Sequence, residues 1–139
     1  MKTISFDFDD TICLWPEAKV NQAIKDLIWK HKNAGDRVVL VTSRWDFTKE
    51  SVLIAFKEWD IPITEEDMYF TNNRDKSHIF FKQVKADAHY DDDEDQLATL
   101  EHHFKFDVFH VDRENITDFR ERKLPPLNPI FEKYAGYFI

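Results

Sequence analysis

Apolar and polar side chains alternate along residues 3–8, which is the period of a β-strand. Residues 37–42, RVVLVT, form an almost continuous apolar run, typical of a strand that is buried on both faces. Between these segments, apolar side chains recur at helical spacing. We expect this helix to begin at residues 15–17, Trp-Pro-Glu, with proline in its first turn, and to end at Gly35.

The alternation of strand and helix patterns continues along the chain and predicts an α/β fold. We expect a doubly wound, mostly parallel sheet with helices on both faces, in one domain spanning residues 1–139 without a cap. The aromatic residues near the C-terminus are expected to pack back on this body. The further predicted elements are a helix from about Phe47 to Pro62, a strand at 68–71, a helix at 76–84, a strand at 86–90, a helix around Leu97 and Leu100, and a strand at 106–111.

Composition excludes several classes of protein. The net charge of -8 is unfavourable for binding long nucleic acid through its phosphates. It is compatible with a substrate that has a short phosphorylated end if a divalent cation offsets the charge. Two glycines are too few for a Gly-rich phosphate-binding loop or a dinucleotide fingerprint. Cys13 is the only cysteine, and we find neither a signal-peptide pattern nor an apolar run of membrane-spanning length. We therefore expect a soluble, cytoplasmic protein, with its oligomeric state left open.

Acidic residues gather directly after two of the predicted strands. Asp7 and Asp9 follow the first strand, and Asp91 and Asp92 follow the strand at 86–90. Ligands bind beyond the carboxyl ends of the strands in such sheets, so we expect these side chains to lie close together. Neighbouring carboxylates raise one another's pKa unless a cation compensates them. An oxygen-rich, histidine-poor cluster suits Mg²⁺, which we therefore predict as the cofactor.

Hydrogen-bond donors and a cation are expected at the same edge of the sheet. Thr42 ends the second predicted strand and is followed by Ser43, while Lys76 begins the helix that precedes the strand at 86–90. Hydroxyl and ammonium groups stabilise the equatorial oxygens of a transferring phosphoryl group. Together with the acidic cluster, these residues predict a site for phosphoryl chemistry.

The order of these motifs resembles that of the haloacid dehalogenase-like (HAD) phosphohydrolases. DFDDT at 7–11 resembles their DxDxT motif, and VVLVT at 38–42 resembles the strand of their second motif. Lys76 resembles the third-motif lysine and Asp91-Asp92 the fourth-motif acid pair. A lone DxD is a weak signal, whereas the ordered set of four is specific. Asp10 departs from the pattern, because glycine is the commonest residue there.

The resemblance implies a role for each acidic residue. Asp7 would be the nucleophile that forms an aspartyl-phosphate, and Asp9 the general acid and base. Mg²⁺ would be held by the Asp7 carboxylate, the main-chain carbonyl of Asp9, and Asp91. Asp92 would support that shell directly or through water. Asp95 also fits a variant spacing of the fourth motif.

The resemblance also implies that Thr42, Ser43 and Lys76 bind the phosphoryl group. Lys82 and Lys85 are alternatives for the third-motif lysine. Lys76 is preferred because it opens its helix at the expected end of the sheet.

The lack of room for a cap domain favours an open site. Open members of the family act on large or protruding substrates, such as nucleic-acid ends or phosphoproteins, although some take small molecules. The Thr-Ser-Arg sequence at 42–44 is similar to the corresponding stretch of polynucleotide kinase 3′-phosphatase domains. We therefore expect a phosphorylated partner that is a nucleic-acid end or a nucleotide, with small sugar phosphates and phosphoproteins as alternatives. Trp15, Arg44 and Trp45 follow the two strands and could contact this substrate.

Two functions of another class compete with hydrolysis. A phosphoacceptor signalling domain also uses acids, threonine and lysine on a doubly wound sheet. In such a domain the phosphoacceptor aspartate ends a middle strand, whereas here DxDxT ends the first one. A catalytically silent binding domain would have less reason to keep Asp7, Asp9, Thr42, Lys76 and Asp91 together.

Overall fold

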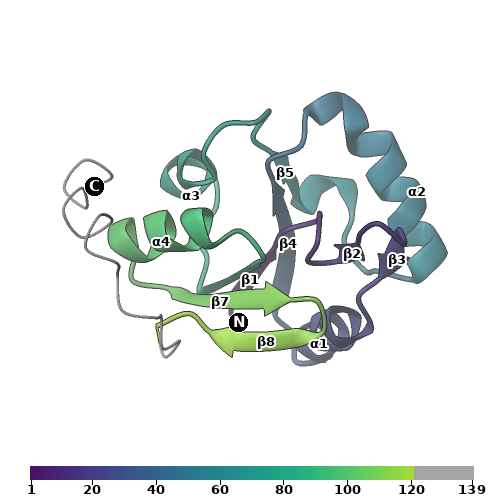
Figure 1. The fold of residues 1–139 in the computed structure, drawn as a ribbon, viewed down its shortest axis with the longest axis horizontal. Coiled ribbons are helices and arrows are strands. Elements are labelled where there is room, and N and C mark those ends of the chain that lie inside the picture. The colour runs from purple at the N-terminus through teal and green to yellow at the C-terminus, as the bar shows by residue number, and fades with distance from the viewer. Residues whose placement is uncertain (121–139) are drawn as a thin grey trace.

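The computed structural model describes residues 1–120, and its centre within that range is a six-stranded sheet (Figure 1). The strands lie in the order β5-β4-β1-β6-β7-β8, and all neighbours are parallel except β7 and β8. The predicted α/β fold with a mostly parallel sheet is therefore confirmed. The strands of this sheet are β1 (Thr3–Phe6), β4 (Arg37–Thr42), β5 (Met68–Phe70), β6 (Ala88–Asp91), β7 (Asp107–Asp112) and β8 (Asn115–Asp118).

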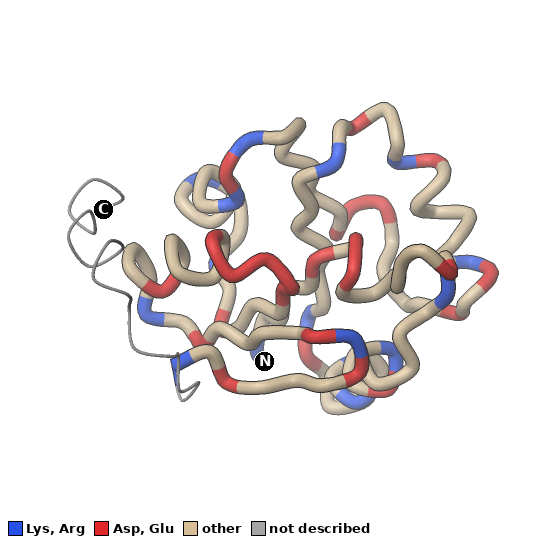
Figure 2. The backbone as a smooth tube through the Cα atoms, in the orientation of Figure 1, with Lys and Arg blue, Asp and Glu red and all other residues tan. Residues whose placement is uncertain are grey.

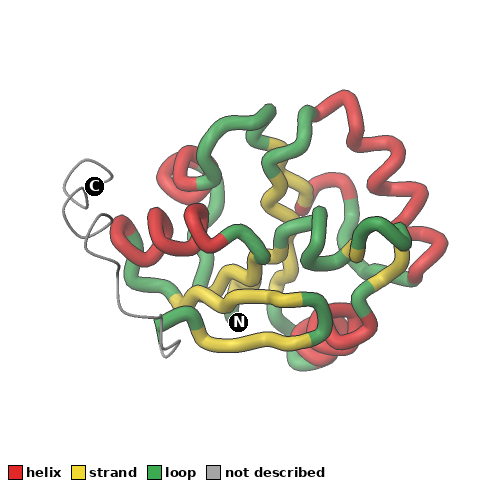
Figure 3. Tube along the Cα trace, in the orientation of Figure 1, coloured by secondary structure: helices red, strands yellow, loops and turns green. Residues whose placement is uncertain are grey.

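Helices cover both faces of the sheet, with α1 and α2 on one face and α3 and α4 on the other (Figures 1 and 3). Successive side chains of β4 point to opposite faces. Val38 and Leu40 pack in the cluster that contains α1 and α2, and Val39 and Val41 pack in the cluster that contains α3 and α4. The helices are α1 (Gln22–Asn33), α2 (Lys49–Trp59), α3 (Ser77–Lys82) and α4 (Glu94–His103), with 3₁₀ turns η1 (Asp46–Thr48) and η2 (Glu65–Asp67).

The strand order creates a topological switch point between β1 and β6. The chain leaves β1 through α1 to reach β4 and β5 on one side, and it returns through α3 to β6 on the other side of β1. Stacked rings connect β1, β6 and β7, because Phe6 lies 4.8 Å from Tyr90 and Tyr90 lies 4.5 Å from Phe109, centroid to centroid. The residues that follow Phe6 and Tyr90 therefore meet at the place where open α/β sheets bind ligands.

The helix predicted to begin at residues 15–17 begins later. Cys13–Leu14 (β2) and Lys19–Val20 (β3) instead pair as a small antiparallel hairpin, and α1 starts only at Gln22. The apolar stripe that indicated a helix is anchored by Ile24, which is fully buried. The residues before this stripe are therefore free to make the hairpin, whose first strand is buried against the core.

The strand β8 was not expected, because the pattern beyond residue 111 is irregular. Its sequence, NITD, offers one apolar side chain, and backbone pairing with β7 decides its structure. At α2 the helix ends at Trp59, with Asp60 in a left-handed conformation, before the predicted stop at Pro62. The aromatic C-terminal segment lies outside the described residues. Within residues 1–120, no helix is both long enough and apolar enough to cross a membrane.

Gly35 ends α1 as predicted, with a φ of +84° that L-residues rarely adopt. A Cβ at this position would meet no atom within 4 Å, so backbone strain alone penalises a larger residue. We expect Gly35→Ala to lower the free energy of unfolding by about 1–2 kcal/mol in urea denaturation. Gly35→Asn should lose less, because asparagine tolerates the left-handed region better. Equal stability of Gly35→Ala and the wild type would contradict this account.

Candidate active site

Three neighbouring parallel strands end together and bring their following side chains to one place. Asp7 follows β1, Thr42 ends β4 and Asp91 ends β6, and in the registers Phe6 lies opposite both Leu40 and Tyr90. Acidic segments from two parts of the chain gather at this edge (Figure 2). A pocket of about 240 Å³, here called the acidic pocket, is lined by Asp7, Asp9, Asp10, Ser43, Lys76, Asp91, Asp92 and Asp93.

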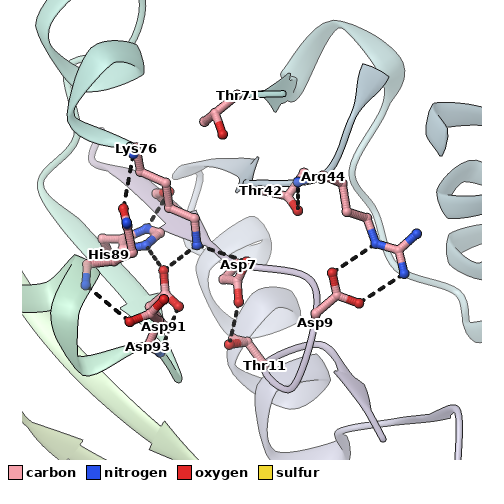
Figure 4. A network of polar contacts seen from close by, with 12 residues as sticks. Asp7, Asp9, Thr11, Thr42, Arg44, Thr71, Lys76, His89, Asp91 and Asp93 are labelled. Atoms are coloured by element: carbon pink, nitrogen blue, oxygen red, sulfur yellow. Dashed lines mark hydrogen bonds and ion pairs between the residues drawn. The ribbon is translucent and has the colours of Figure 1, made fainter. Parts of the chain in front are cut away.

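Lys76 is the lysine that reaches the acidic pocket. Its Nζ lies 2.9 Å from Oδ1 of Asp7 and also contacts Oδ2 of Asp91, and only 2% of the residue is exposed (Figure 4). The alternatives Lys82 and Lys85 are exposed and do not line this pocket. Burial opposes the ammonium form, but the two carboxylates outweigh it and raise the pKa of Lys76. One ammonium thus serves two buried carboxylates.

The carboxylates of Asp7, Asp91 and Asp92 could hold a metal ion, and we call them the acidic triad. Each offers one oxygen atom within 4.8 Å of the others, with Asp7 and Asp91 buried and Asp92 half-buried. Oδ1 of Asp91 accepts a hydrogen bond from the backbone N–H of Asp93 at 3.0 Å, which fixes the carboxylate. An all-oxygen donor set fits a hard divalent cation.

Burial and mutual repulsion affect the carboxylates of the acidic triad unequally. Burial and the charge of Asp91 raise the pKa of Asp7 well above its usual range, although Lys76 opposes this. Burial raises the pKa of Asp92 to about 6. Burial would also raise the pKa of Asp91, but Lys76 and a hydrogen bond from His89 lower it. A divalent cation beside these oxygens would relieve the remaining repulsion.

His89 is a component of the site that the sequence analysis missed. Its Nε2 lies 2.8 Å from Oδ2 of Asp91 and its Nδ1 lies 2.8 Å from Oγ of Ser5, its register partner on β1. Burial lowers the pKa of His89, although Asp91 opposes this, so the ring is neutral. A carboxylate only accepts, so Nε2 donates to Asp91 and Nδ1 accepts from Ser5. The signal was available, because His89 lies two residues before Asp91 and therefore on the same face of β6.

The Asp9 carboxylate points away from the acidic triad. Its two oxygens accept hydrogen bonds from Nε and Nη2 of Arg44, each at 2.9 Å, and Oδ1 also accepts one from Nε1 of Trp15 at 2.9 Å. The guanidinium of Arg44 lies 4.9 Å from the centroid of Phe8. Arg44 and Trp15, both expected near a substrate, thus hold Asp9 in the structure. The predicted metal contact through the Asp9 main-chain carbonyl stays a prediction.

Hydroxyl groups and one strained turn complete the site. Thr11 donates to Oδ2 of Asp7 at 3.3 Å, so both Asp7 oxygens have a donor. The buried Thr42 hydroxyl accepts the backbone N–H of Arg44 at 3.2 Å and keeps its own proton to donate. Asp10, the departure from the motif, has a φ of 58°, in the region that glycine favours. Asp10 therefore adopts the backbone conformation that glycine would adopt. Trp45, also expected near the substrate, does not line the acidic pocket.

Comparison with known proteins supports the fold. No protein-family model matches the chain, and no curated protein matches it. A chain in the solved structure of the Pnkp1/Rnl/Hen1 complex is similar, with a TM-score of 0.69 and 18% sequence identity. The similarity covers 82% of this chain and 47% of that chain, so this chain spans about half the length of its structural neighbour. At this identity the comparison shows a shared fold.

Removing the Lys76 ammonium should destabilise the protein in a pH-dependent way. We expect Lys76→Met to lower the free energy of unfolding by about 3–5 kcal/mol near neutral pH, because two buried carboxylates lose their partner. An acid whose pKa is raised by folding destabilises the folded state as pH rises above its unfolded value of about 3.9. The stability difference between Lys76→Met and the wild type should therefore shrink as pH falls toward 5. Lys82→Met, which changes an exposed lysine, should stay within about 0.5 kcal/mol of the wild type.

A divalent cation should stabilise the folded protein through the acidic triad. At about 100 times its dissociation constant, Mg²⁺ or Mn²⁺ should add about 2.7 kcal/mol to the free energy of unfolding, measured by urea denaturation. Asp92→Asn should abolish most of this gain. The matched control is Asp95→Asn, which removes an exposed acid from the same run and should keep it. If Asp95→Asn lost the cation-dependent stabilisation and Asp92→Asn kept it, the cation would be bound by Asp95, the residue that fits the variant spacing of the fourth motif.

Proposed function

We propose that the chain is a Mg²⁺-dependent phosphomonoester hydrolase of the HAD-like type that acts through an aspartyl-phosphate. The observation that carries this proposal is the placement of Asp7 at the switch point, with its oxygens held by Lys76 and Thr11 and two further carboxylates beside it. The Asp7 carboxylate is buried and oriented by hydrogen bonds next to the Lys76 ammonium, an arrangement that suits a nucleophile better than a solvent-exposed acid. Residues 1–139 would form one such domain.

In the proposed reaction, one oxygen of Asp7 attacks phosphorus and the bond from phosphorus to the ester oxygen breaks. Asp9, which would take up a proton once it has left Arg44, gives that proton to the leaving oxygen. In the second step Asp9 takes a proton from a water molecule, whose oxygen attacks phosphorus. The bond between phosphorus and Asp7 then breaks, which releases inorganic phosphate and restores both carboxyl groups.

The remaining residues would stabilise charge in both steps. Lys76 and the hydroxyls of Thr42 and Ser43 would bind the equatorial phosphoryl oxygens. Mg²⁺, held by the acidic triad, would supply positive charge that offsets repulsion between the substrate and the carboxylates. Asp9 has to leave Arg44 to reach the ester oxygen, and this exchange frees the guanidinium for an anionic group of the substrate.

The architecture supports an open site. Within the described residues, only the β2–β3 hairpin is inserted between the first motif and α1, and only η1, α2, η2 and β5 lie between Thr42 and Lys76. An open site fits a protruding phosphate, such as a nucleic-acid end or a nucleotide. Small sugar phosphates and phosphoproteins are the alternatives within the same chemistry. A signalling domain would keep the phosphoryl group on Asp7, and a silent binding domain would not form the bond.

Substitution of Asp7 tests the hydrolase directly. With a generic phosphate ester and Mg²⁺, we expect phosphate release by the wild type and a loss of about 10³- to 10⁶-fold in Asp7→Asn, because no nucleophile remains. EDTA should abolish release in the wild type. Asp26→Asn, an exposed acid on α1, should retain full activity. Equal release by the wild type and Asp7→Asn would refute the mechanism, and retained label on wild-type Asp7 without release would favour the signalling alternative.

A further inference from the structure

A second cavity lies beside the acidic pocket and differs from it in charge. This cavity, of about 420 Å³, is here called the basic groove. It includes Arg74, His78 and Lys82 in its lining, and none of its lining residues is an aspartate or glutamate. Arg74, His78 and Lys82 are exposed, and none of them forms an ion pair with a residue in the range 1–120. The chain as a whole has a net charge of -8, whereas the lining of this cavity carries two exposed cations, Arg74 and Lys82, and no acid.

The basic groove also carries an exposed aromatic platform. Trp45 lines it with 51% of its surface exposed, and Phe47, 79% exposed, stacks on Trp45 with ring centroids 6.4 Å apart and planes at 20°. Large exposed aromatic rings beside cations match the two parts of a single-stranded nucleic acid, whose bases stack and whose phosphates pair with positive charge.

The basic groove adjoins the acidic pocket along two segments of backbone. On one segment, Ser43 lines the acidic pocket and Trp45, two residues later, lines the basic groove. On the neighbouring segment, Lys76 lines the acidic pocket and Arg74, two residues earlier, lines the basic groove. Hydrogen bonds tie the segments together, because the N–H of Asn73 donates to the Ser43 carbonyl at 2.7 Å. Two residues span at most about 7 Å of chain. A ligand with its end in the acidic pocket therefore needs little further length to enter the basic groove.

The opposite side of the acidic pocket would repel a polyanion. A cavity of about 370 Å³ there, called the acidic groove, shares Asp10 and Asp92 with the pocket and adds Glu94 and Asp112. Its one arginine, Arg113, is paired with Glu17. An anionic chain whose end lies in the acidic pocket thus meets cations in one direction and carboxylates in the other.

We propose that the basic groove binds the single-stranded nucleic-acid segment that carries the phosphate to be removed. The terminal phosphate would occupy the acidic pocket, a neighbouring base would stack on Trp45, and the next phosphates would pair with Arg74 and Lys82. The assignment rests on the proposed hydrolase function for its catalytic part, whereas binding by the groove can be measured alone.

The test uses a fluorescently labelled single-stranded DNA of about twelve nucleotides with a terminal phosphate, in 3′ and 5′ forms. Trp45→Ala should raise its dissociation constant about tenfold, because a stacking surface is lost. The double variant Arg74→Ala, Lys82→Ala should flatten the dependence of log K on log salt by roughly 1.4, since each single-strand phosphate contact contributes roughly 0.7. The matched control is Lys57→Ala, an exposed cation on α2, which should leave both quantities unchanged.

Turnover separates this proposal from the hydrolase itself. The groove variants should raise KM for the oligonucleotide and leave kcat/KM for p-nitrophenyl phosphate unchanged, because that small ester does not reach the groove. Equal KM for the oligonucleotide in the wild type and the groove variants would overturn the proposal. An increase in KM for a phosphopeptide that is as large as the increase for DNA in the same variants would also overturn it. If no ester is hydrolysed at all, the hydrolase proposal fails. DNA binding that the groove variants weaken would still support the basic groove as a binding site for single-stranded nucleic acid. DNA binding that the groove variants leave unchanged would overturn that assignment.

Discussion

The ammonium group of Lys76, buried between the carboxylates of Asp7 and Asp91, is the contact on which the rest of the site depends. It joins the start of α3 to the ends of β1 and β6, so three segments distant in sequence share one charged centre. Burying these groups costs several kcal/mol for each ion, and the interaction repays that only with close geometry and further hydrogen bonds. Thr11, His89 and the backbone of Asp93 supply those hydrogen bonds. The centre still carries more negative than positive charge, so a divalent cation among the carboxylates would offset the excess.

Much of the fold follows from local patterns that tertiary structure does not override. The run RVVLVT is buried on both faces because helices cover both, and its apolar residues divide between the two core clusters. The hairpin at residues 13–20 and strand β8 were not predicted, since the structure of each depends on backbone pairing between strands rather than on its own periodicity. A sequence such as NITD becomes a strand because β7 offers it an unpaired edge.

The site also has residues that the sequence could place and contacts that it could not. Asp7, Thr42 and Asp91 could be placed because carboxyl ends of adjacent parallel strands must meet, and Lys76 because it opens a helix at that edge. The contacts of His89 with Ser5 depend on the register between β1 and β6, which a single sequence does not reveal. The pairing of Asp9 with Arg44 depends on how two loops fold over Phe8, and the sequence alone suggested only that both residues lie nearby.

The contrast between the basic groove and the acidic groove has a kinetic consequence. Two cavities of opposite sign that adjoin one pocket would form a local dipole, and an approaching polyanion would experience a torque even though the net charge of -8 does not attract it. Collisions in the wrong orientation would be repelled before contact, so a larger share of encounters would begin in the productive direction. Such orientational steering weakens as dissolved ions shorten the reach of the field, which is about 10 Å at 0.1 M ionic strength.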